Sequence, residues 1–256
     1  MTKIRFYIIS FLSVIIFCSF SLSNDEKDYL IGVKPYPIKY YYDVLDEMYG
    51  DGCSYRKLGG DSVAVQQSFS LQQANGGEPS ILIPAKIKYK NRVYRVVSLG
   101  DKAFQSTRIS SVMFPETWDR ISSYSCQKCY HLKHIYIPNT IKKIGMCSFE
   151  RTGLDSITIP TGVKSIGSRA FRECKLKYVE LPESLETIGD DAFSYNYDLK
   201  CVKVHFKEPI RISRNVFFFT TPVMKIKLIV PVGCKEKFSN VKPWSLFSDI
   251  EEDSNL

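Results

Sequence analysis

The sequence predicts a mainly β solenoid with short helical turns between its strands. The first observation is a period, because Pro115, Pro138, Pro160 and Pro182 are 23, 22 and 22 residues apart. The second is that the same residue types return at the same offsets in each copy. A unit of this length cannot bury its own apolar side chains, but a stack of near-identical units buries a continuous column of them.

Three short patterns mark each copy. Ile-Gly pairs stand at 144–145, 166–167 and 188–189, with Leu-Gly at 99–100 before them and a degenerate Ile-Ser at 121–122. A small residue followed by an aromatic recurs at 103–104, 148–149, 170–171 and 192–193. Each copy closes on an apolar alternation, at 132–137, 154–159, 176–181 and 199–204. Two apolar segments per copy predict two faces of one coil.

Each pattern has a physical reason. Alternation with period two sends apolar side chains inward and leaves Thr158, Glu180 and Lys203 outside. The proline that follows ends the strand because it cannot donate a hydrogen bond to the ladder. A glycine after isoleucine fits a corner that needs a positive φ or a close backbone approach. Cap residues such as Ser168 and Asp190 then favour one short helical turn, which carries the aromatic into the core.

These residues resemble a known family. The pattern Pro-x-x-Val-x-x-Ile-Gly-x-x-Ala-Phe-x-x-Cys-x-Leu-x-x-Val-x-Leu at 160–181 is similar to the BspA-like leucine-rich repeat of secreted and surface proteins. The resemblance covers about residues 84–231. It implies a leucine-rich-repeat solenoid, a right-handed superhelix, that serves adhesion or protein binding. It brings no family-wide catalytic residue.

Residues 1–23 have the character of a secretory signal peptide. Lys3 and Arg5 precede an apolar run that is too short for a comfortable membrane span, and Ser21-Leu22-Ser23 is a suitable cleavage site. A lipid-modified Cys18 is disfavoured because Phe17, a large residue, stands before it. Cleavage after Ser23 predicts an exported chain, secreted or held at the cell surface, with net charge +6 instead of +8.

Both ends of the repeat array are predicted to be capped. Residues 24–83 read as a β-rich N-terminal cap, with strands at 40–45 and 62–71 and a turn cluster at 75–79, since an open solenoid end exposes an unpaired edge. A hairpin around 90–92 leads into the solenoid of residues 84–231. Residues 232–256 form a C-terminal cap and tail, in which Phe238, Trp244, Phe247 and Ile250 cover the last coil.

A possible zinc site is the sequence Cys126-Gln-Lys-Cys129-Tyr-His131-Leu-Lys-His134. The repeat register argues against it, because Cys126 occupies the aromatic position, Cys129 occupies the position of Cys174, and His134 lies in the strand. Seven cysteines follow the leader, and no complete disulfide framework emerges from their spacing. No nucleophile motif or phosphate loop is present, so we expect no enzyme, no cofactor and no metal.

The outward strand face is the predicted binding surface. Its candidate residues are tyrosine, histidine and lysine on successive strands: Lys133, His134, Tyr136, Lys177, Tyr178 and Lys203. An extracellular or surface protein is the expected partner, with a glycan as an alternative ligand and a structural envelope component without ligand as a second alternative. The basic residues are interspersed with acidic ones, so we expect no nucleic acid. The chain is predicted to be a monomer with no membrane span once the leader is removed.

Overall fold

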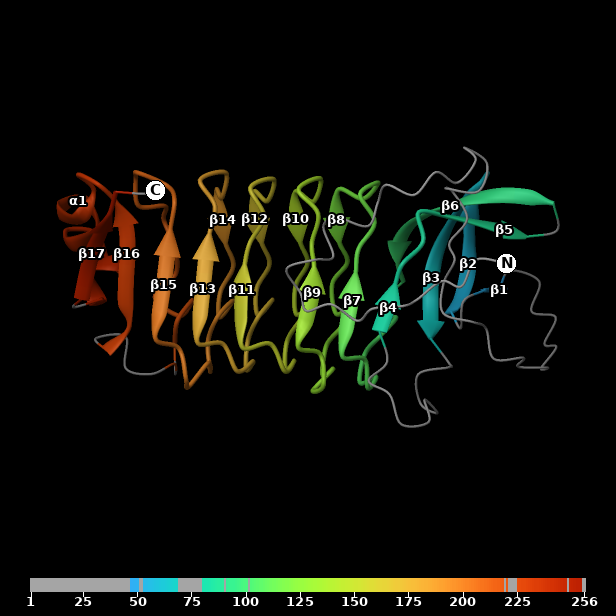
Figure 1. The fold of residues 1–256 in the computed structure, drawn as a ribbon, viewed down its shortest axis with the longest axis horizontal. Coiled ribbons are helices and arrows are strands. Elements are labelled where there is room, and N and C mark those ends of the chain that lie inside the picture. Colours follow the sequence, from blue (N-terminus) through green and yellow to red (C-terminus); the bar gives the residue numbers. More distant parts are fainter. Residues whose placement is uncertain are drawn as a thin grey trace, which may run out of the picture.

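The computed structural model describes residues 47–50, 53–68, 80–89, 91–100, 102–218, 220, 225–247 and 249–254. The predicted leader, Cys18, the strand at 40–45 and the turn at 75–79 lie outside these residues. Figure 1 shows coils stacked along one axis, with a separate sheet at the N-terminal end and a small helix at the other. The fold is therefore the predicted mainly β solenoid.

The N-terminal sheet has five strands in the order β1-β2-β3-β6-β5. Their bounds are Glu47–Gly50 (β1), Cys53–Gly59 (β2), Ser62–Ser68 (β3), Lys86–Tyr89 (β5) and Arg92–Leu99 (β6). Neighbours are antiparallel except β3 and β6, which are parallel. The described part of the predicted strand at 62–71 is β3, and the predicted hairpin is confirmed as β5 and β6, which join this sheet through β6. Tyr55, Val63 and Val96 are buried in its core.

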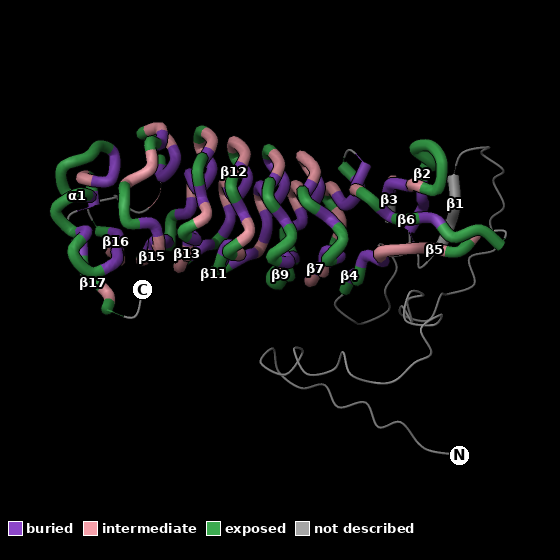
Figure 2. Tube along the Cα trace, turned by 90° about the horizontal axis from the view of Figure 1, so that it is seen from above, coloured by how far each residue is buried: buried purple, intermediate pink, exposed green. Residues whose placement is uncertain are grey.

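One side of the solenoid, here called the strand face, carries two parallel sheets, β4-β7-β9 and β11-β13-β15-β16-β17. The strands are Ser80–Leu82 (β4), Ser111–Met113 (β7), His134–Tyr136 (β9), Ser156–Thr158 (β11), Tyr178–Leu181 (β13), Cys201–Val204 (β15), Lys227–Pro231 (β16) and Asp249–Asp253 (β17). The opposite side carries a parallel sheet of two-residue strands, Arg120–Ile121 (β8), Lys143–Ile144 (β10), Ser165–Ile166 (β12) and Thr187–Ile188 (β14). The two sides enclose the core (Figure 2).

A stack of phenylalanine rings runs through that core. Phe149, Phe171, Phe193 and Phe217 are fully or almost fully buried, and successive centroids are 5.4, 5.4 and 5.6 Å apart in stacked geometry. The backbone N–H of each of the first three donates to a carbonyl of the next coil at 2.8 to 2.9 Å. The rings are thus held by the coil spacing, which confirms the aromatic position of the repeat as an inward one.

One coil exchanges large and small residues between two positions. Cys126 occupies the aromatic position, and Phe114 occupies a position filled by Ile137 and Ile159 in later coils. The Phe114 ring meets Phe149 edge-on at 6.0 Å, on the side where a phenylalanine at 126 would otherwise stack. The exchange keeps the core filled, as close packing requires.

The predicted short helical turn after each glycine is wrong. Residues 146–151 and 168–173 form successive hydrogen-bonded turns, with positive φ at Cys147, Arg151, Arg169 and Glu173. The glycines themselves need close approach instead, because a Cβ on Gly167 would lie 2.6 Å from the backbone N of Met146. A helix would carry the chain along its own axis, whereas in these turns alternate N–H groups, such as those of Arg169 and Phe171, donate to the neighbouring coil.

The C-terminal end closes with aromatic residues around helix α1 (Lys235–Ser239) and the 3-10 turn η4 (Trp244–Leu246). Trp244 packs against Phe206, Phe217, Phe238 and Phe247 with centroid distances of 5.5 to 6.3 Å. The Trp244 indole N–H donates to the Ile210 carbonyl at 2.8 Å. The apolar residues predicted to cover the last coil are buried there, and β17 extends the strand face beyond them.

Candidate functional site

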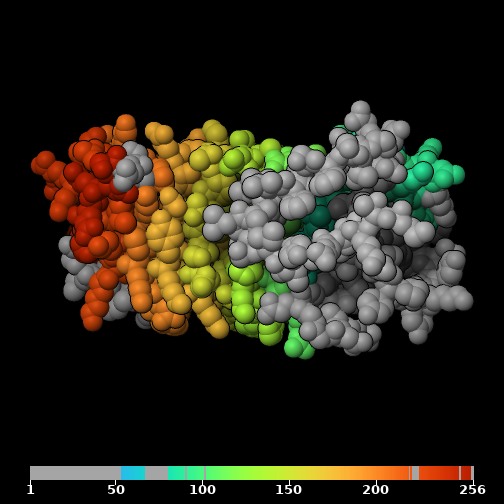
Figure 3. Space-filling view, viewed as in Figure 1, coloured from blue at the N-terminus to red at the C-terminus, as the bar shows by residue number. Residues whose placement is uncertain are grey.

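The strand face carries two columns of outward side chains in register. In the first column Ser111 pairs with His134, and Ser156, Tyr178, Cys201, Lys227 and Asp249 follow one another across the second sheet. In the second column Met113 pairs with Tyr136, and Thr158, Glu180, Lys203, Ile229 and Glu251 follow in the same way. The predicted order of outward residues is confirmed within each sheet. Figure 3 shows the molecule from this side.

The six predicted site residues fall into two groups. Lys133, His134 and Tyr136 lie on or just before β9, and Lys177, Tyr178 and Lys203 lie around β13 and β15. The intervening strand β11 belongs to the second sheet. Lys133, His134, Tyr136 and Lys177 are exposed, whereas Tyr178 and Lys203 are half-buried. The two groups therefore share one face but do not form one contiguous cluster.

Glu180 is a hub of this face that sequence reasoning did not identify as part of the site. Its carboxylate lies 2.7 Å from Nε2 of His205 and accepts a hydrogen bond from Thr158 at 3.1 Å. Burial works to raise the pKa of Glu180, but hydrogen bonds with His205, Thr158 and Tyr178 together hold that pKa below its ordinary value. Glu180 is therefore an anion fixed between neighbouring coils. The sequence could have indicated this role, because hydrogen-bond donors stand about one repeat before and after the acidic residue, at Thr158 and His205.

Two predicted binding residues are half-buried and interact with neighbouring strands. Nζ of Lys203 is 3.0 Å from the Asp253 carboxylate, with about one fifth of the lysine side chain exposed. Burial, followed by the charge of Glu180 and a hydrogen bond with it, raises the pKa of Tyr178 far above its ordinary value. Tyr178 and Lys203 thus stabilise the face, which makes Lys133, His134, Tyr136 and Lys177 the more accessible candidates.

Tyr136 is the exposed aromatic of this face. It is 43% exposed, and its hydroxyl donates to the Glu116 carboxylate at 2.9 Å. This bond orients the ring without burying it. A rigid aromatic with a polar tip contributes contact area at a low entropic cost when a partner binds.

The apparent zinc ligands point in different directions. Cys126 and Cys129 are fully buried, whereas His131 and His134 are exposed. The Cys129 thiol donates to the Phe104 carbonyl at 2.9 Å, and Cys174 makes the equivalent bond to Phe149 at 3.2 Å. Within the described part of the chain, no group of three or more His, Cys, Asp or Glu side chains is placed to hold a metal ion.

The buried thiols have structural surroundings. Burial raises the pKa of Cys126, and it raises the pKa of Cys174 to about 11. Thr152 stands between Cys129 and Cys174 in the same column and lies 3.2 Å from the Cys174 sulfur. The two thiols are therefore two coils apart, as predicted, and no disulfide joins any two cysteines among the described residues.

A polar network runs along the turns at another edge. Gln127 donates to Glu150 at 2.6 Å, Arg172 contacts the same carboxylate at 2.8 Å, and the Arg172 guanidinium lies 4.4 Å from the centre of the Tyr195 ring. Burial by itself would raise the pKa of Glu150, but hydrogen bonds from Gln127, Arg172 and Cys147 outweigh it and together hold that pKa below its ordinary value. The network links successive coils and offers no open coordination or nucleophile.

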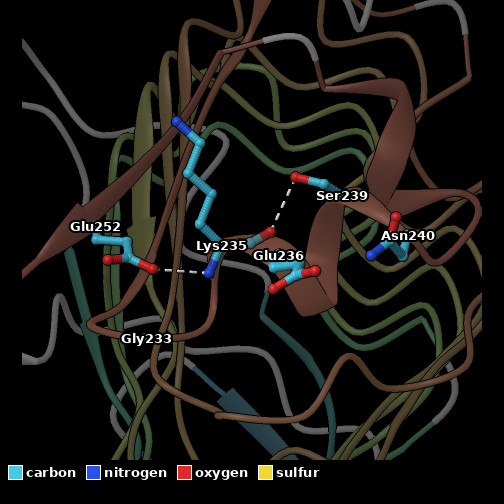
Figure 4. Close-up of a pocket in the computed structure, with 6 residues that line it drawn as sticks. All are labelled: Gly233, Lys235, Glu236, Ser239, Asn240 and Glu252. Atoms are coloured by element: carbon cyan, nitrogen blue, oxygen red, sulfur yellow. Dashed lines mark hydrogen bonds between the residues drawn. The ribbon is translucent and has the colours of Figure 1, made fainter.

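A shallow depression of about 540 Å³ lies beside helix α1 (Figure 4). Its polar groups are engaged with one another, since the Lys235 backbone N–H donates to Glu252 at 2.8 Å and the Ser239 hydroxyl donates to the Lys235 carbonyl at 2.9 Å. Gly233, Glu236 and Asn240 complete its lining. We assign it no ligand because its best-placed donors already have acceptors.

Comparison with protein families decides what the repeats are. Residues 119–233 match the family model described as the BspA type leucine rich repeat region, in six copies. These repeats are BspA-type leucine-rich repeats. The resemblance in the sequence is thereby confirmed, and the stacked rings and the inward cysteines lie within the matched residues.

Solved structures of bacterial leucine-rich repeat proteins share the fold. One from Bacteroides ovatus is 24% identical with a TM-score of 0.57, over 74% of this chain and 55% of its own. One from T. pallidum is 23% identical with a TM-score of 0.52, over 62% of this chain and 71% of its own. The chain thus spans little more than half the length of the first. The comparison with curated proteins gives no match.

The helices of the described residues are short. None of them has the length and apolar character that crossing a bilayer demands.

Proposed function

We propose that this chain is a non-catalytic binding module that recognises a protein ligand through the strand face of its BspA-type array. The observation that carries the proposal is the separation of roles between positions of the repeat. Inward residues such as Val179 and Leu181 are fully buried, while the outward residues vary in chemistry from coil to coil. The coil does not require tyrosine, histidine or lysine at the outward positions.

The accessible part of this face has the chemistry of a protein interface. Tyr136 supplies an exposed ring beside the polar and positive groups of Lys133 and His134, and Lys177 adds a positive group farther along the same face. Aromatic residues on a rigid support give binding energy, and surrounding charges guide association with an acidic partner. Export is part of the proposal, with the leader-like residues 1–23 as its support. Such a module would act in adhesion at the cell surface or in the secreted fraction.

The test is a capture experiment with paired variants. Immobilised protein is exposed to extracellular proteins from the natural surroundings of the organism, and the retained proteins are compared with those retained by two triple variants. The strand-face variant is Lys133→Ser, Tyr136→Ser and Lys177→Ser. Tyr178 and Lys203 are left intact because they are half-buried, so their replacement would confuse a loss of binding with a loss of stability.

The control variant carries the same types of change away from the strand face. It is Tyr124→Ser, Lys142→Ser and Lys143→Ser, which also removes one tyrosine and two lysines. A partner that is lost tenfold with the strand-face variant, about 1.4 kcal/mol, and is kept by the control supports the proposal. Equal capture by the protein and both variants would refute it.

Two alternative functions make different predictions in the same experiment. A carbohydrate-binding protein would retain glycans from a glycan array, again in a manner sensitive to the strand-face variant. A structural envelope component would retain neither proteins nor glycans at specific residues. The protein ligand remains our choice because Tyr136, the exposed aromatic of this face, is of a residue type enriched at the hot spots of protein interfaces.

A further inference from the structure

The β5–β6 hairpin carries closely spaced basic residues and no acidic one. Between Glu78 and Asp101 the sequence holds five basic residues and no acidic one. Four of the five, Lys86, Lys88, Arg92 and Arg95, lie on the two strands. Figures 1 and 2 show that the hairpin extends away from the coils at the N-terminal end, with exposed residues at its tip.

The strand register gathers three of these cations on one face. Lys86 lies directly opposite Arg95, and Lys88 lies opposite Val93, one step further along the hairpin. Directly paired residues are about 5 Å apart, diagonal neighbours about 7 to 8 Å, and alternate residues on one strand about 7 Å. Lys86, Lys88 and Arg95 therefore form a compact cationic group along a ribbon two strands wide.

The apolar contacts of the hairpin come from its other face. The core side of the hairpin carries Tyr94, which belongs to the hydrophobic core, and Ile87, which packs against that core. Like charges directly opposite each other in a sheet are unfavourable, so the Lys86 and Arg95 pair conflicts with local stability. Arg92 and Arg95 are exposed, and no ion pair holds either of them in the part of the chain that the structure describes.

We infer that this hairpin is a binding site for a linear polyanionic glycan, a sulfated or uronic-acid polysaccharide. A narrow row of cations follows a chain of negative charges, and release of the counterions condensed on such a chain drives association. A membrane surface fits less well, because the outward face offers only Val93 and Val97 for insertion, each less than 40% exposed. The inference is independent of the strand-face proposal, since it concerns a different sheet at the N-terminal end of the array.

The test measures binding to heparin, a sulfated polysaccharide, as a function of salt. The hairpin variant is Lys88→Gln with Arg95→Gln, and the control variant is Lys142→Gln with Lys143→Gln, which removes the same charge from the opposite side of the coils. We expect the hairpin variant to raise Kd about tenfold at low salt and to reduce the salt dependence of binding. The control should change Kd less than about twofold.

Two further measurements keep the test decisive. The charge-preserving variant Lys88→Arg with Arg95→Lys should retain heparin binding, which separates loss of charge from loss of folding. Vesicles of phosphatidylserine and phosphatidylcholine serve as the competing anionic surface, and neutral dextran as the uncharged chain. The inference is overturned by equal losses in the hairpin and control variants, by absence of heparin binding, or by binding to vesicles alone.

Discussion

Removal of one ring from the middle of the phenylalanine stack is the most direct test of the core. Phe171 has no exposed surface and stacks on Phe149 and Phe193, each at 5.4 Å. Its replacement by alanine loses the transfer free energy of the ring, leaves a cavity and breaks two aromatic contacts. Phe→Ala substitutions in cores cost about 3 to 5 kcal/mol, and each aromatic pair is worth about 0.5 to 1.5 kcal/mol.

We expect Phe171→Ala to lower the free energy of unfolding by about 4 to 5 kcal/mol, near the upper end of that range, because the surrounding coils cannot collapse into the cavity. The backbone bonds from Phe149 to Ala170 and from Phe171 to Ala192, at 2.9 and 2.8 Å, fix the coil spacing on both sides. The cost depends on how far a site relaxes, and a stacked ladder relaxes little.

The assay is equilibrium unfolding in urea followed by circular dichroism. Thr187→Ala is the control, because Thr187 is exposed on the opposite sheet and its loss should cost less than about 0.5 kcal/mol. A repeat protein can lose cooperativity when one interface weakens, so the slope of the transition is compared as well. A cost for Phe171→Ala below about 1.5 kcal/mol, or one equal to that of Thr187→Ala, would show that the inward assignment is wrong.

Four further outcomes are expected. Cys126→Phe and Phe114→Leu should each destabilise the protein by about 1 to 3 kcal/mol, and the double variant should recover at least half of the summed loss. If the two losses simply add in urea unfolding, the large residue at 114 does not compensate for the small residue at 126. Gly167→Ala should cost more than about 2 kcal/mol because its Cβ would lie 2.6 Å from backbone, and a neutral effect on the thermal midpoint would contradict the close approach. Glu180 has a lowered pKa in the folded protein, so its stabilising effect is present above about pH 5 and is lost as the pH falls through the pKa of the folded state. Glu180→Gln should therefore weaken the loss of stability at acidic pH when the free energy of unfolding is measured against pH. An unchanged loss at acidic pH would exclude Glu180 as its source. Elemental analysis should find no stoichiometric zinc in the purified protein, and one zinc per chain would overturn the argument from repeat register.

The sequence by itself determined the stacking of the coils and the side on which each repeat residue lies. With side chains alternating every two residues and motifs returning every 22 or 23, only one register places residues such as Leu176 and Val179 in a common core. The same logic separated buried Cys126 and Cys129 from exposed His134, and it ordered Thr158, Glu180 and Lys203 along one column before any contact was known.

The tertiary structure decided the features that the repeat leaves free. Successive turns with positive φ at Cys147 and Arg169 replace the expected helical turn, because alternate N–H groups there, including those of these two residues, donate to the next coil rather than to their own. Lys203 pairs with Asp253, 50 residues away, only because β17 extends the sheet after the last coil. Such contacts join segments without a common period, so no pattern in the sequence encodes their distance. Because such contacts leave residues like Lys203 half-buried, the exposed part of the strand face is smaller than its two outward columns alone predicted.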